Sequence, residues 1–246
     1  MCGTKRLFSS YIDHVIKIEA TKINLWKEGM FKLPTIFAVM KILIAAATAE
    51  EISILKEIDT YGHEIDFLIT GIGMVPTAYM ITRQFAAGEY DLAINIGLAG
   101  SFDRSLEIGE VVRVEIDHLS EVGAEDGDNF LTLEDMGLEG LSSVSLEIDY
   151  HSDTLNSLPV VTGITVNTVH GNASSIEKIV NRLNPSVETM EGAAFLFVCK
   201  RERTMAIQLR SISNYIEERN KDNWNIPLAL SNLHRTIIQI LQEITE

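Results

Sequence analysis

The sequence predicts a single α/β domain in which a central, largely parallel or mixed sheet is flanked by helices. From residue 41 onward, short apolar runs typical of buried strands alternate with helical patterns. Hydrophobic residues make up 46% of the 246-residue chain and charged residues 22%, an ordinary composition for a soluble protein with a substantial core. No linker divides residues 40–246, so we expect one domain there.

The first half of this domain contains four predicted strands and two predicted helices. KILIAAA predicts a buried strand, and a helix that begins near Glu50 directs Ile52, Leu55 and Ile58 inward. DFLITGIG predicts a strand and a turn. VPTAYMITRQFAA predicts an amphipathic helix with Pro76 in its first turn, where proline is tolerated. DLAINIG and EVVRVEID predict two more strands, the second more polar than the first.

The second half alternates in the same way after an irregular segment. Residues 121–158 are acidic and show too little periodicity for elements to be assigned. VVTGITVNTV then predicts a strand, and ASSIEKIVNRLN predicts a helix that ends at Asn184-Pro185. VETMEGAAFLFVCKRE contains an apolar helix, TMAIQLRSISN predicts a late strand, and IPLALSNLHRTIIQILQEI predicts a long C-terminal helix.

Residues 1–39 differ in charge from the rest of the chain. They contain six Lys and Arg against three Asp and Glu, whereas the whole chain has a net charge of −15. We interpret them as an N-terminal extension, either disordered or upstream of a natural start at Met40. IFAVMKILIAAATAE resembles a signal peptide, but Lys41 interrupts its apolar region and cleavage would remove the first core strand. The prediction is therefore a cytoplasmic protein.

Composition also excludes several classes of partner. The strong negative charge argues against nucleic acid and anionic membranes, which require basic surfaces. Cys2 and Cys199 suggest no disulfide framework, and six scattered histidines lack metal-ligand spacing, so we expect no metal. Gly71-Ile72-Gly73 begins a dinucleotide fingerprint, but Pro76 occupies the third glycine position, which indicates a tight turn instead.

Polar residues and glycines gather where the predicted strands end. In open α/β sheets, ligands bind outside the carboxyl ends of strands, where small residues let the backbone approach the ligand. The features in question are Glu50-Glu51, the NIGLAGSF segment with its glycines at 97 and 100, Asn167-Thr168, Glu188, Glu191 and Ser213-Asn214. We expect them to converge on one cleft.

These segments, taken in order, resemble the landmarks of the nucleoside phosphorylase/nucleosidase superfamily. The matching stretches are KILIAAATAEEISIL, TGIGMVPTAYMI, LAINIGLAGSF, GITVNTVHGNASSIEKI, VETMEGAAFLFV and QLRSISNYIEERNKDNWNIPLAL. Within the superfamily they are most similar to the futalosine hydrolases, nucleosidases of the alternative menaquinone pathway. The resemblance spans about residues 40–246. It implies a nucleoside phosphorylase-like fold, a homo-oligomer, a small nucleoside as substrate and no cofactor.

The resemblance implies that the VETMEG motif binds the ribose of the substrate. In relatives the Met-Glu pair of this motif meets the sugar, which implies that Met190 packs under the ribose and Glu191 accepts hydrogen bonds from its hydroxyls. Charge-assisted bonds of this kind contribute about 1.5–3 kcal/mol each when buried. Many relatives have a VEMEG-like motif, whereas this chain has Thr189 between Glu188 and Met190. Glu188 is still counted among the expected substrate contacts.

The acidic residue after the first strand is expected to position the attacking water. ATAEEISIL aligns best with Glu51 in this role, with Glu50 as the alternative. A glutamate at a helix start is also a good partner of the helix dipole. Phosphorylases of the superfamily usually carry a Gly-Asp-Pro-x-Arg-like loop at this place, and the acidic AATAEE would repel phosphate. Water is therefore the expected acceptor.

Ser213-Asn214 lies where adenine-specific nucleosidases carry Ser-Asp. An asparagine has both an acceptor and a donor, so Asn214 suits a 6-oxopurine: it donates to the exocyclic oxygen and accepts from a protonated N7. The resemblance adds Ala99, Gly100 and Thr168 to the expected substrate contacts, and places His170 and Asn172 near the base. In YIEERNKDNW, Arg219 is the expected partner of a 5′ carboxylate, beside Lys221 and Trp224.

The predicted function is the hydrolysis of futalosine to hypoxanthine and dehypoxanthine futalosine. Glu51 and Asn214 are its predicted catalytic residues. One alternative is an adenosine-type nucleosidase acting on methylthioadenosine or aminodeoxyfutalosine. Another is a nucleoside-binding protein without catalytic activity.

Overall fold

The structure is a computed structural model that describes residues 39–146, 150 and 152–244. Residues 38–246 form one compact unit. The predicted N-terminal extension, apart from Val39, lies outside the described residues. No helix in the described part of the chain is long and apolar enough to cross a membrane.

A mixed sheet forms the centre of the domain, as predicted. Its order is β10-β4-β8-β9-β3-β1-β2, and β10 also pairs with β3, so that five of the strands close into a barrel-like ring. Strands β1, β2, β3 and β10 are parallel, whereas β4 and β9 run antiparallel to their neighbours β10 and β3. The strands are β1 (Lys41–Ala46), β2 (Glu64–Ile69), β3 (Leu92–Ser101), β4 (Val111–Leu119), β8 (Val160–Thr165), β9 (Val187–Thr189) and β10 (Met205–Tyr215).

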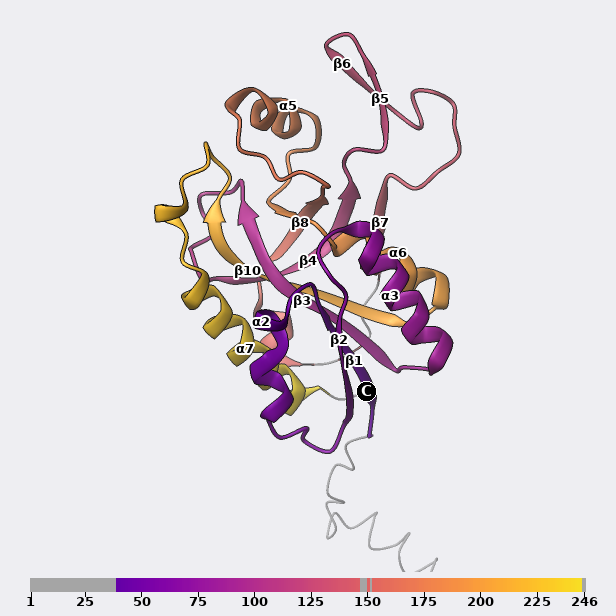
Figure 1. Cartoon of the computed structure of the whole chain (residues 1–246), viewed down its shortest axis with the longest axis vertical. Coiled ribbons are helices and arrows are strands. Elements are labelled where there is room, and N and C mark those ends of the chain that lie inside the picture. The colour runs from indigo at the N-terminus through magenta and orange to yellow at the C-terminus, as the bar shows by residue number, and fades with distance from the viewer. Residues whose placement is uncertain (1–38, 147–149, 151, 245–246) are drawn as a thin grey trace, which may run out of the picture. The chain divides into compact units, whose positions relative to one another are not determined.

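Helices cover both faces of this sheet (Figure 1). Alternate residues of β1 divide between two cores. Ile44 belongs to the core with α7 (Ile226–Glu243) and the short α2 (Ala49–Ile52). Leu43 belongs to the core with α3 (Met74–Ala87) and α6 (Gly192–Glu202). The apolar strand run is therefore buried on both sides.

Most predicted elements are confirmed within one or two residues, including α5 (Ala173–Leu183). The helix expected near Glu50 is shorter than its pattern suggests, since α2 has four residues and continues as the 3-10 helix η1 (Ser53–Glu57). The unassigned segment 121–158 holds a hairpin of β5 (Gly123–Asp126) and β6 (Asn129–Thr132), then β7 (Ser143–Ser145) and α4 (Asp153–Ser157). Its strands have three or four residues, too few for a periodic signal.

Two threonines cap the N-terminus of α6. Glu191 is the N-cap residue, but its side chain makes no capping bond. Thr189 Oγ1 instead accepts the N–H of Gly192 at 3.2 Å, and Thr165 Oγ1 accepts that of Ala193 at 2.8 Å. Orphan N–H groups of the first turn are thus satisfied from β8 and β9, which leaves the Glu191 carboxylate available for other contacts.

Asp117 lies beneath this helix start and is completely buried. It accepts hydrogen bonds from Thr165 Oγ1 and Gln208 Nε2, both at 2.8 Å. Burial raises the pKa of Asp117 to about 6, although both hydrogen bonds and the charge of Arg210 oppose this shift. Gln208 Oε1 is buried and has no hydrogen-bond partner among the described residues. The network therefore contains one costly charge and one unsatisfied acceptor.

We predict that Asp117→Asn stabilises the protein at pH 8. The folded-state pKa lies above the ordinary 3.8, so the fold loses stability as pH rises from about 4 through 6 and Asp117 ionises. Asparagine removes this cost, and a flip of the Gln208 amide would give its unsatisfied oxygen a donor. The expected gain in unfolding free energy at pH 8 is roughly 1–3 kcal/mol, measured by urea denaturation. It should shrink toward pH 4, and a loss at pH 8 would contradict the prediction.

Candidate active site

Glu51 is fixed at the end of β1 by three hydrogen bonds. Its Oε2 accepts from the backbone N–H and the hydroxyl of Thr48, at 2.9 and 3.0 Å. Its Oε1 accepts from the N–H of Leu98 on β3 at 3.2 Å. A Cβ on Gly97 would lie 2.9 Å from this oxygen, so glycine is required for the carboxylate to approach the strand. Glu50 is exposed and makes none of these contacts.

Arg210 lies next to the same glycine and was not predicted from the sequence. Its side chain is 1% exposed, and it donates to the carbonyls of Leu209 and Asn95 and to the side-chain oxygen of Asn95. A Cβ on Gly97 would be 3.6 Å from its Nη1. The available signal is a charged residue inside a predicted buried strand, since arginine is rarely buried without a partner.

Glu191 completes this group and is held from the other side of the site. Its Oε1 accepts the N–H of Gly73 at 2.9 Å, and Gly73 has φ of +100°, a conformation that favours glycine. Burial raises the pKa of Glu191, and the negative charge of Glu51 adds to this effect. The Gly73 N–H and the positive charge of Arg210 oppose it.

Glu51, Glu191 and Arg210, which we call the Arg210 cluster, place two carboxylates around one buried cation. Burial lowers the pKa of Arg210, while the charges of Glu191, Glu51 and Asp117 counteract this effect. A guanidinium stays protonated in proteins because its ordinary pKa is so high. This arrangement can orient a polar ligand that both donates and accepts hydrogen bonds, such as water or a sugar hydroxyl.

A second group of residues surrounds Asn214. Asn214 pairs with Gly100 of β3 through a register shift in β10 that follows Ile212. Ser213 Oγ lies 2.8 Å from Asn214 Oδ1 and 3.3 Å from the carbonyl oxygen of Ala99, while Asn214 Nδ2 donates to the carbonyl of Tyr215 at 3.0 Å. One N–H and one lone pair of the amide remain for a ligand.

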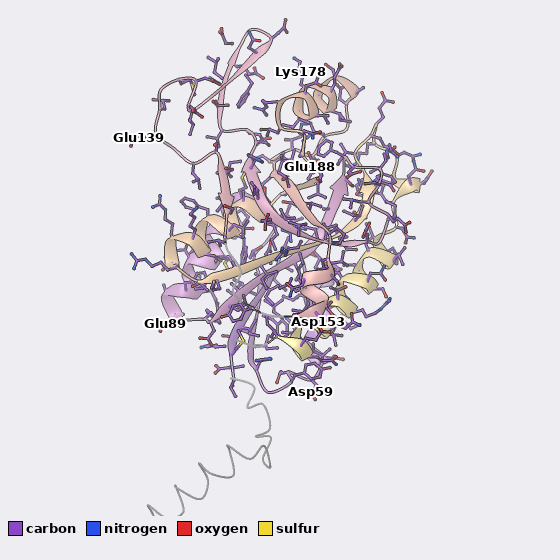
Figure 2. The ribbon with its side chains drawn as sticks, turned by 180° about the vertical axis from the view of Figure 1, so that it is seen from behind. Asp59, Glu89, Glu139, Asp153, Lys178 and Glu188 are labelled. Carbon is purple, nitrogen blue, oxygen red and sulfur yellow. The ribbon has the colours of Figure 1, made fainter. Side chains whose placement is uncertain are left out.

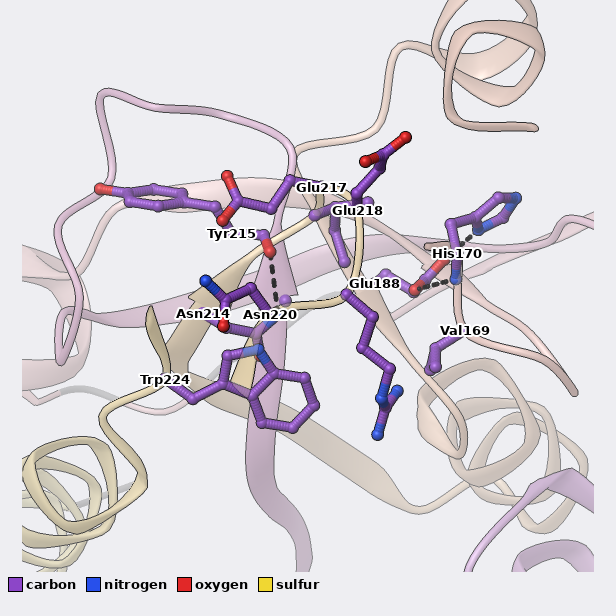
Figure 3. Close-up of a pocket in the computed structure, with 12 residues that line it drawn as sticks. Val169, His170, Glu188, Asn214, Tyr215, Glu217, Glu218, Asn220 and Trp224 are labelled. Carbon is purple, nitrogen blue, oxygen red and sulfur yellow. Dashed lines mark hydrogen bonds and ion pairs between the residues drawn. The ribbon is translucent and has the colours of Figure 1, made fainter. Parts of the chain in front are cut away.

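Asn214 lines a pocket at this end of the sheet (Figure 3). The Arg219 guanidinium, also in its lining, lies 5.0 Å from the centre of the Trp224 ring. Arg219 thus shares the pocket with Asn214, the residue expected to meet the base. The other lining residues are Gly100, Val169, His170, Glu188, Tyr215, Ile216, Glu217, Glu218 and Asn220.

Glu188 is a buried member of this lining. Its side chain is 1% exposed and lies within the body of the domain, unlike Glu89 and Glu139 at its edge (Figure 2). One carboxylate oxygen accepts the backbone N–H of His170 at 2.9 Å, and the other contacts His170 Nδ1. The pair joins β9 to the loop that follows β8.

Five predicted substrate contacts are not among the lining residues of this pocket: Met190, Glu191, Ala99, Thr168 and Ser213. Met190 is half-buried at the turn between β9 and α6, beside Glu191. Thr168 is exposed in the loop between β8 and α5, two residues before His170. Asn172, the N-cap of α5, uses its side chain to accept the N–H groups of Ser174 and Ser175. These ligand assignments remain predictions.

Across residues 39–146, 150 and 152–244, no three His, Cys, Asp or Glu side chains are grouped so that they could hold a metal ion. The free thiol of Cys199 is buried in α6, and burial raises its pKa.

Two kinds of nucleosidase are similar to this chain in sequence. Futalosine hydrolase from Acidothermus cellulolyticus is 27% identical over 215 residues, which cover 80% of this chain and 88% of that protein. A 5′-methylthioadenosine/S-adenosylhomocysteine nucleosidase from Bacillus thuringiensis is 25% identical over 233 residues, 83% of this chain and 100% of that protein.

Among solved structures, a 5′-methylthioadenosine/S-adenosylhomocysteine nucleosidase from Colwellia psychrerythraea in complex with adenine superposes with a TM-score of 0.71. It is 19% identical, and the match covers 85% of this chain and 99% of that one. The predicted nucleoside phosphorylase-like fold is therefore confirmed. The phosphorylase superfamily itself matches residues 57–242. The chain belongs to the phosphorylase superfamily.

Proposed function

We propose that the protein is a purine nucleosidase that hydrolyses futalosine to hypoxanthine and dehypoxanthine futalosine. The observation that carries this proposal is the Asn214 amide, which keeps one donor and one acceptor in its pocket. The Arg210 cluster supports a hydrolytic reaction nearby. Similarity to both futalosine hydrolase and methylthioadenosine nucleosidase supports the reaction class.

In the proposed reaction, the bond between C1′ of the ribose and N9 of the base breaks, and its electron pair leaves with the base. Glu51 orients a water molecule whose oxygen bonds to C1′, and Glu51 takes up the proton that the water loses. The departing base takes a proton at N7 from solvent. Glu191 accepts hydrogen bonds from the ribose hydroxyls, and Met190 packs under the sugar.

Asn214 selects the base in this scheme. Its free N–H donates to the 6-oxo group of hypoxanthine, and its free lone pair accepts from N7–H as charge develops on the leaving base. A 6-amino group would present a donor to a donor and leave buried groups unpaired. Ser213 fixes the orientation of the amide through its contact with Asn214 Oδ1.

Water, rather than phosphate, is the proposed acceptor because two carboxylates already offset the positive charge of Arg210. Arg210 is buried, and the negative charges of Glu51 and Glu191 offset its positive charge, which disfavours binding of an incoming phosphate there. The protein is proposed to act as a homo-oligomer, which would bury the exposed side chains of Ile72, Val75 and Tyr79. Arg219 remains the proposed partner of the 5′ carboxylate.

We predict that the purified protein releases hypoxanthine from futalosine without phosphate and releases little adenine from aminodeoxyfutalosine. Chromatography of the free bases measures both reactions. Adenine release at an equal or greater rate would favour the adenosine-type alternative, and with it a function like that of the methylthioadenosine nucleosidase relatives. Binding without any base release would favour a binding protein.

We predict that Glu51→Gln lowers kcat by about 10²–10⁴-fold, because the amide cannot take up the proton of the attacking water. The neighbouring Glu50→Gln is the matched control, since Glu50 is exposed and should leave kcat within about twofold. Steady-state kinetics on futalosine measures both. A larger loss in the Glu50 variant would move the water-orienting role to Glu50.

We predict that Asn214→Asp lowers kcat/KM for futalosine by about 10²-fold and shifts the preference toward aminodeoxyfutalosine, because a carboxyl group suits the 6-amino base. Asn220→Asp adds the same charge in the same pocket and should leave the preference unchanged. The ratio of kcat/KM for the two substrates is the measured quantity. An unchanged ratio in the Asn214 variant would remove this residue from base selection.

A further inference from the structure

Glu188 is a buried acid that the proposed reaction does not yet use. In β9, Val187 points into an apolar core and the Thr189 hydroxyl caps α6. Glu188 lies between these two residues in the strand and lines the pocket. A buried carboxylate is costly unless it is paired. Within the described residues, the hydrogen bonds and the ion pair of the Glu188 side chain involve His170 alone.

Glu188 and Asn214 lie on either side of the same backbone position. Gly100 is the partner of Glu188 in the pairing of β3 with β9, and of Asn214 in the pairing of β3 with β10. A Cβ on Gly100 would be 3.2 Å from Asn214 Nδ2. Both side chains line the pocket, with Asn214 beside Trp224 and Glu188 beside His170 (Figure 3).

The contact between Glu188 and His170 determines which hydrogen-bond donors and acceptors this wall of the pocket presents to a ligand. The backbone N–H of His170 is already used by the Glu188 carboxylate at 2.9 Å. That donor is therefore not available to an acceptor on a base. An ionised carboxylate has about four lone-pair positions, and His170 uses two of them, so Glu188 presents acceptors where the backbone alone would present a donor.

From this arrangement we infer that Glu188 is a second specificity-determining residue, which accepts a hydrogen bond from N1–H of a 6-oxopurine. The inference rests on the proposed function and extends it from one edge of the base to the next. A 6-oxopurine carries a proton on N1 beside its oxo group, so an amide and a carboxylate together match it. A 6-aminopurine has a lone pair at N1, which the carboxylate repels.

The position of Glu188 within β9 fits this role. Thr189 caps α6, and the alternation of side chains along a strand directs Glu188 to the opposite face, where it lines the pocket. If Glu188 served only to anchor the loop of His170, its removal would lower stability without altering the choice of base. The two roles are therefore separable by experiment.

The test measures binding of hypoxanthine, adenine and 1-methylhypoxanthine to the full chain by calorimetry, with Tm as a check of folding. The wild type should bind hypoxanthine at least about 10-fold more tightly than either other base. The Glu188→Gln variant keeps the side-chain volume. In it, the ratio of the affinity for hypoxanthine to that for adenine, and the ratio to that for 1-methylhypoxanthine, should each fall by about 10-fold. Glu218→Gln, which changes an exposed carboxylate of the same pocket, should leave them unchanged.

A Glu188 variant that binds all three bases more weakly by the same factor, or only melts earlier, would overturn the inference. If that variant does not fold, the wild type still decides: equal affinity for hypoxanthine and 1-methylhypoxanthine would exclude a bond to N1–H. Hypoxanthine binding without discrimination would leave the proposed nucleosidase standing. Failure of every purine to bind would overturn both proposals.

Discussion

The buried guanidinium of Arg210 is the interaction on which the site depends. The charge of Arg210 acts on two carboxylates from segments far apart in the sequence, Glu51 after β1 and Glu191 before α6, and opposes their mutual repulsion. Desolvating such charges is expensive, and removing one partner leaves the others uncompensated. Asn95 holds the guanidinium from β3 through its side chain and carbonyl, so the charge balance is built into the centre of the sheet.

Closure of the sheet places the Asn214 pocket and the Arg210 cluster on the same strand, β10. Strand β10 pairs with both β3 and β4, and it supplies Arg210, Ser213 and Asn214 within five residues. The register shift after Ile212 sets Asn214, rather than Ser213, opposite Gly100. The irregularity in β10 thus lies between Arg210, whose charge offsets those of the carboxylates, and Asn214, which lines the pocket.

The sequence predicted the fold well because long apolar strands and amphipathic helices carry strong periodic signals, as in β3 and α7. The expected site residues Glu51, Glu191 and Asn214 lie in α2 after β1, after β9 and near the end of β10, and their roles stay predictions. Arg210 and Asp117 were missed because each is one of several polar residues in its strand, and the partners that mark them come from other strands. The helix at Glu50 was overextended because apolar spacing alone does not distinguish an α-helix from a 3-10 turn.

Thr189 has a consequence for how this motif is compared with that of its relatives. One added residue in a strand exchanges the side chains that face inward with those that face outward. The residues before and after it then no longer follow the same alternation. A shift of one residue within β9 would exchange Glu188, which lines the pocket, with Thr189, which caps α6. A single added residue in a strand this short can therefore change the chemistry of a pocket, although in sequence it is only a change of length.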